Sequence, residues 1–115
     1  MSNKVQKSSA MKMFHIMSPK FNLREVAKHC ALLEDHLSHP PKRCPDCIRK
    51  HFLTIEAFLE EAVTLDKSGE MTEMLQASAA YVRTLQALWI DGRDMNEIAQ
   101  LLRQMRKKIT GDVFD

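Results

Sequence analysis

The chain has 115 residues, of which 44% are hydrophobic and 28% are charged. This length suits one domain, this composition is that of an ordinary globular protein, and no apolar run approaches the roughly 18 residues of a membrane-spanning helix. The net charge is +2, but residues 1–20 carry four Lys and all 15 acidic residues come later. A basic arm on a nearly neutral body disfavours a nucleic-acid-binding surface on that body, and leaves the arm as the segment suited to nucleic acid.

The arm, residues 1–20, shows no regular periodicity and is closed by Ser18-Pro19. It lacks an unbroken apolar core, so we expect no signal peptide and an intracellular, reducing location. We expect an extended arm followed by one helical domain over 21–115. The apolar residues of the arm suit the groove of a partner protein, and a tail folded back on its own body explains them equally well. They are Met11, Met13, Phe14, Ile16 and Met17.

The first helix is predicted over 22–37. Asn22 is a good N-cap residue and Glu25 stands at the capping-box position. Apolar residues then recur at helical spacing, whereas Glu34 falls on another face. The prolines of the following segment end the helix and suit an antiparallel return of the chain.

Three further helices are expected. The second begins at Cys44 or Pro45 and runs to about Asp66, and the third covers about 70–90. Asp94 caps the fourth, which Gly111 is expected to end. A basic run near the end of this last helix suits the helix dipole. The sequence therefore predicts an all-α, antiparallel four-helix bundle.

The strongest chemical signal is the spacing C-x2-C-x3-H formed by Cys44, Cys47 and His51. Steps of about 100° per residue place all three side chains on one stripe at the start of the second helix. Thiolate and imidazole are the ligands that tetrahedral zinc prefers, and a helix N-terminus favours thiolates. We therefore expect a structural Zn²⁺ that clasps the first hairpin.

A structural zinc ion needs a fourth ligand, and the first helix offers candidates. His36 lies at the level of the second helix's first turn and is the preferred fourth ligand. Cys30 is next, deeper on the apolar face, and His29 and His39 follow. The function of such a site is to fasten two helices of a small structural or adaptor protein, which docks on other proteins through its arm and helical surface.

Thiol redox chemistry is the alternative. Cys44 and Cys47 at a helix start have the placement of a dithiol pair, in which one thiol attacks and the other resolves. Four-helix flavin-dependent sulfhydryl oxidases place C-x-x-C similarly, and the chain resembles them over Cys44 to Phe52. It lacks their W-x-x-x-H stretch before this motif and their H-N-x-x-N pattern after it.

The two first helices also carry a broader resemblance. The segments Leu32 to Leu37, Arg43 to Phe52 and Glu56 to Asp66 are similar to small helical C-x-x-C-x-x-x-H proteins encoded by large DNA viruses. The resemblance covers about 35 residues and brings no known activity. It implies a component of a larger protein assembly, such as a minor capsid protein in a virion, rather than a metabolic enzyme.

Overall fold

The computed structural model describes residues 18–114, with side chains as far as residue 111. This part of the chain is helical and contains no strand, which confirms the predicted all-α class. No helix in it combines the length and apolar character needed to cross a membrane. The elements are α2 (Pro19–Ser38), the short 3-10 helix η1 (Pro40–Lys42), α3 (Pro45–Leu65), α4 (Thr72–Ile90) and α5 (Met95–Phe114).

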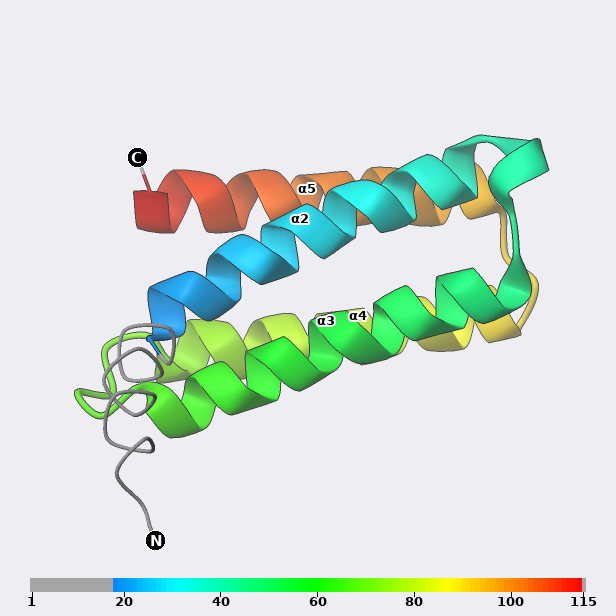
Figure 1. The fold of residues 1–115 in the computed structure, drawn as a ribbon. Helices are drawn as coiled ribbons and strands as arrows, with labels where there is room; N and C mark the ends of the chain where they lie inside the picture. The colour runs from blue at the N-terminus through cyan, green and yellow to red at the C-terminus, as the bar shows by residue number, and fades with distance from the viewer. Residues whose placement is uncertain (1–17, 115) are drawn as a thin grey trace, which may run out of the picture.

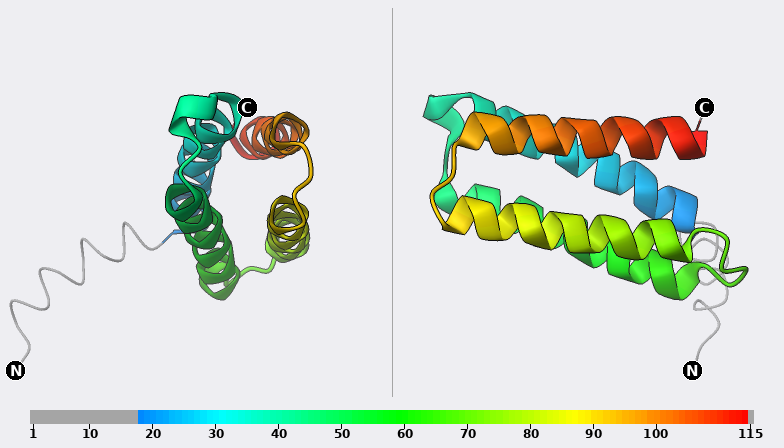
Figure 2. Two further views of the ribbon diagram at one scale, coloured as in Figure 1. Left: turned by 90° about the vertical axis from the view of Figure 1, so that its right-hand side faces the viewer. Right: turned by 180° about the vertical axis from the view of Figure 1, so that it is seen from behind.

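The four long helices pack side by side in a bundle-like arrangement (Figures 1 and 2). α2 packs extensively against both α3 and α5, and α3 packs against α4, whereas α4 and α5 meet over a smaller area. The start of α2, the start of α4 and the end of α5 lie at the same end of the molecule (Figure 1). Each of the four long helices contributes fully buried residues to one core, among them Leu33, Phe52, Leu75 and Leu102.

The start of α2 differs from the prediction. The helix begins at Pro19, three residues before the predicted cap, and Ser18 is its N-cap because its hydroxyl accepts a 3.1 Å hydrogen bond from the Phe21 amide. Asn22 therefore lies inside the first turns, where it is 1% exposed. Its side-chain amide donates to the Phe58 carbonyl at 3.0 Å and to Glu61 Oε1 at 2.9 Å. The rest of the predicted arm, residues 1–17, lies outside the described residues.

The end of α5 also differs from the prediction, because the helix continues through Gly111 to Phe114. The two glycines between helices do have left-handed backbones, with φ of +77° at Gly69 and +83° at Gly92. In these turns the left-handed conformation favours glycine. Asp94 caps α5 as predicted, since its carboxylate accepts a 3.1 Å hydrogen bond from the Asn96 amide.

A buried ion pair joins α2 to α5. Glu34 is 6% exposed, although its sequence position suggested a face away from the core. Arg106 donates to both of its carboxylate oxygens, at 2.7 and 3.0 Å, and Arg103 approaches to 3.6 Å. The hydrogen bonds that Arg106 donates to Glu34 raise the pKa of Arg106.

Candidate functional site

The predicted cysteine pair lies at the start of α3. Cys44 is the N-cap, with the extended backbone (φ −84°, ψ 117°) typical of that position, and Pro45 is the first helical residue. The Cys44 sulfur accepts a 3.3 Å hydrogen bond from the Cys47 amide. The predicted start of α3 at Cys44 or Pro45 is thus confirmed. The N-cap acceptor is a cysteine sulfur, where most helices have the side-chain oxygen of Ser or Asp.

The two thiols differ in acidity. A hydrogen bond from the Cys47 side chain, helped by the Cys47 backbone amide, lowers the pKa of Cys44. The same side-chain interaction raises the pKa of Cys47. Cys44 is exposed and Cys47 half-buried, so solvent and solutes have access to the pair. Cys44 is consequently the sulfur that ionises first, either as a ligand or as a nucleophile.

His36, the preferred fourth ligand, lies near the end of α2. Its Nδ1 is 2.8 Å from the Lys42 carbonyl oxygen, in the segment that leads to α3. Because a carbonyl oxygen only accepts hydrogen bonds, Nδ1 must carry the proton, and in the neutral ring Nε2 keeps its lone pair. The ring centre lies 5.1 Å from that of His51. The structure therefore brings the rings of His36 and His51 together, while their sharing of one metal ion stays a prediction.

His51 lies between His36 and a second histidine of α2. His29 Nδ1 is 3.2 Å from His51 Nδ1, and the two ring centres are 5.4 Å apart. His29 also stacks on Phe58, with 6.1 Å between ring centres. Desolvation, and then the neighbouring His29 and His36, lower the pKa of His51. At neutral pH His51 is therefore uncharged, which is the form that binds metals.

The other two candidates for the fourth ligand have different surroundings. Cys30 has no exposed surface and belongs to the core, where burial and the nearby Glu34 carboxylate raise its pKa to about 12. A thiol that is so hard to ionise is a poor metal ligand. His39 is 59% exposed and pairs with the Asp35 carboxylate at 2.9 Å, at the outer side of the turn.

The site as it stands consists of two groups, the Cys44–Cys47 pair and the row of rings formed by His29, His51 and His36. In the described part of the chain, no three His, Cys, Asp or Glu side chains already form an arrangement that could hold a metal ion. Cys47 and His51 are one helical turn apart on α3, about 6 Å along its axis. His29 ranked low among the candidate ligands predicted from the sequence. It nevertheless lies seven residues before His36, a spacing that puts both side chains on one face of α2.

Comparison with known proteins adds no relative: no family model, no curated protein and no solved structure matches this chain significantly.

Proposed function

We propose that the protein is a small structural or adaptor protein whose first, antiparallel hairpin is closed by one structural zinc ion. The observation that carries the proposal is the position of the His36 ring. The Lys42 carbonyl fixes the proton on its Nδ1, which leaves its Nε2 free to bind a metal. The centre of this ring lies 5.1 Å from the centre of the His51 ring. Two imidazoles bound to one tetrahedral zinc, with Zn–N distances of about 2.0–2.1 Å, have ring centres about 5 Å apart. The proposed ligands are Cys44, Cys47, His51 and His36.

The hydrogen bonds around the histidines support the same assignment. If His51 binds zinc through Nε2, its Nδ1 carries the proton and donates it to His29 Nδ1, 3.2 Å away. Metal-bound histidines generally have such an outer partner, which fixes the tautomer and the ring orientation. In the proposal His29 is therefore a positioning residue and not a ligand.

The thiols support it through the acidity of Cys44. Zinc would displace a proton from each thiol, and the lowered pKa of Cys44 reduces the cost of releasing the first. A structural zinc site contributes about 10–16 kcal/mol of binding free energy, comparable with the whole stability of a domain this size. The ion would thus fasten the start of α3 to the end of α2. The resulting rigid hairpin suits a component of a larger protein assembly, such as the viral capsid that the resemblance implies.

Zinc content tests the proposal. Protein that is freshly purified without any chelator should show one zinc ion per chain and no flavin in a native mass spectrum. Cys47→Ser and His36→Ala should each lose the ion. His29→Ala should keep it with about 10–100-fold weaker affinity, as expected for an outer partner. Chelation should lower the melting temperature of the wild-type chain.

His39→Ala is the matched control, since His39 lies on the same turn but faces solvent and pairs with Asp35. It should keep the zinc ion and its affinity. Wild-type protein that takes up no zinc when zinc is supplied, or Cys47→Ser protein that binds it as tightly, would overturn the proposal.

A flavin-dependent thiol oxidase is the second candidate. The observation that favours it is the exposed Cys44, whose lowered pKa and helix-start position suit an attacking thiolate. In that case the purified protein should be yellow and consume oxygen with a dithiol substrate, and Cys47→Ser should stop turnover. Bound flavin with oxygen consumption would replace the structural proposal, because Cys44 and Cys47 would then be catalytic residues.

A further inference from the structure

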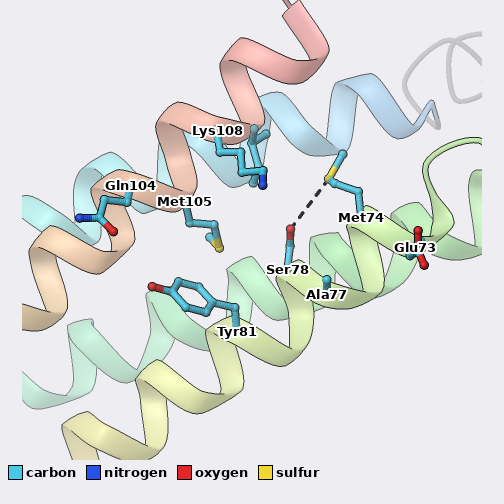
Figure 3. A pocket seen from close by; sticks show the side chains of 9 residues that line it. Glu73, Met74, Ala77, Ser78, Tyr81, Gln104, Met105 and Lys108 are labelled. Carbon is cyan, nitrogen blue, oxygen red and sulfur yellow. Dashed lines mark hydrogen bonds between the residues drawn. The ribbon is translucent and has the colours of Figure 1, made fainter.

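A groove runs between α4 and α5, where these helices pack less closely than the other neighbouring pairs. It has a volume of about 590 Å³. Its walls are mainly apolar, with Met74, Ala77 and Tyr81 on α4 and Met105 and Ile109 on α5. Figure 3 shows the Met74 and Met105 side chains on opposite sides of it, with Ser78 between them.

The position of the groove relates it to the beginning of the chain. Its lining starts at Glu73, in the first turn of α4, and reaches Ile109 near the end of α5. Both lie at the end of the molecule where α2 begins with Ser18 (Figure 1). Seventeen residues precede Ser18. The chain therefore enters α2 at the end of the molecule where the groove opens, so the residues before Ser18 need not cross the 50 Å length of the bundle to reach it.

The chemistry of residues 11–17 complements that of the groove. Five of these seven residues are Met, Phe or Ile, side chains that fill irregular apolar gaps well. The segment also contains the cation Lys12, and the α4 rim of the groove carries the exposed carboxylate Glu73, which has the opposite charge. Lys108 on the α5 wall disfavours a basic segment on that side, so the segment should lie along α4.

We propose that residues 11–17 pack into the groove between α4 and α5 of their own chain. A covalent tether gives this segment an effective concentration in the millimolar range, which favours it over a second copy of the chain at ordinary protein concentrations. The proposal does not depend on the zinc site, whose residues lie at the other end of α2.

Methionine methyl contacts provide the test, because three methionines lie in the segment and two in the groove. Full-length protein with ¹³C-labelled methionine methyl groups should show nuclear Overhauser contacts from Met11, Met13 or Met17 to Met74 or Met105. The charged substitution Phe14→Asp in the segment, or Ala77→Glu in the groove, should abolish them. Absence of the contacts in the wild-type chain would overturn the proposal.

Ala80→Glu is the matched control, since Ala80 is exposed on the same helix but does not line the groove. It should leave the contacts unchanged, and the far-ultraviolet circular dichroism of all variants should match the wild type. A second copy as the occupant is tested by mixing chains with leucine at 74 and 105 and chains with leucine at 11, 13 and 17. Any contact seen in this mixture would arise between chains, because neither chain has methionine both in the segment and in the groove, and it would also overturn the proposal.

Discussion

Two buried polar residues of α2 tie this helix to two different neighbours. Asn22 donates hydrogen bonds to Phe58 and Glu61 of α3, and Glu34 accepts two from Arg106 of α5. A buried polar group without a partner costs more free energy than its hydrogen bond contributes, so each residue penalises any packing that separates it from its neighbour. Apolar contacts drive the helices together, and these two residues favour one alignment of α2.

Asn22→Ser distinguishes this tertiary role from the capping role that the sequence suggested. Serine caps helices about as well as asparagine and has similar helix propensity, but it is too short to keep both bonds to α3. We expect the free energy of unfolding to fall by about 1–2 kcal/mol, measured by urea denaturation. Ser18→Ala should cost about 1 kcal/mol because it removes the observed cap. An unchanged stability of Asn22→Ser would mean that Asn22 acts only as a cap.

Glu34→Gln tests the ion pair between α2 and α5. The substitution keeps the side-chain shape but leaves Arg106 without a buried anion, so we expect a loss of about 1.5–3 kcal/mol in the free energy of unfolding. Glu60→Gln is the control, because Glu60 is 61% exposed and its partner Arg83 is 51% exposed. Such a surface pair contributes less than about 1 kcal/mol. Equal effects of the two substitutions in denaturant melts would contradict the buried role of Glu34.

At the scale of the elements, substitution by alanine should have opposite effects on stability at two glycines. Gly111 lies within α5, and an added Cβ would meet no atom within 4 Å. Gly111→Ala should therefore raise the free energy of unfolding by about 0.5–1 kcal/mol, since glycine is a poor helix former. Gly92→Ala should lower it by about 1 kcal/mol or more, because its φ of +83° is unfavourable for alanine. If Gly111→Ala destabilises the protein in thermal melts, α5 ends at Gly111 after all.

The helices could be predicted from the sequence wherever the signal was local. Pro45 and the glycines of the turns act within a few residues of themselves, and the helices begin or end near them as expected. The predicted start of α2 was wrong because two residues, Ser18 and Asn22, can each cap a helix locally. The hydrogen-bond partners that hold Asn22 inside the helix lie 36 and 39 residues away in the sequence. The pairing of Glu34 with Arg106 joins residues 72 positions apart, which no helical periodicity reveals.

The candidate site was predictable to a similar degree. The stripe of Cys44, Cys47 and His51 follows from helix geometry once Cys44 is the N-cap of α3, and the turn after α2 brings the His36 ring beside that of His51. That these four residues hold one metal ion stays a prediction. The partners of the histidine rings were not predictable. The Lys42 carbonyl meets His36 only because of the path that the chain takes through η1. His29 meets His51 only because of the way α2 and α3 cross. Tertiary packing sets both, and the same packing buries Cys30.

At the scale of the whole molecule, the two proposed features lie at opposite ends. The cysteines and His36 lie where α2 ends and α3 begins, whereas the groove opens where α2 begins. The structure is 50 Å long, so a ligand at one end makes no direct contact with the other. Changes in zinc content and changes in residues 11–17 should therefore act on stability independently, as expected for separated sites.

The unequal packing of the helices also determines which part of the fold opens first. α2 buries surface against two neighbours, whereas α4 has one extensive interface, with α3, and a smaller one with α5. Separating α4 exposes the least surface, so its amide protons should exchange with solvent through local opening faster than those of α2. Hydrogen–deuterium exchange followed by mass spectrometry should show peptides of α4 exchanging first and peptides from the middle of α2 last. Equal protection of the two helices would mean that the bundle opens only as a single unit.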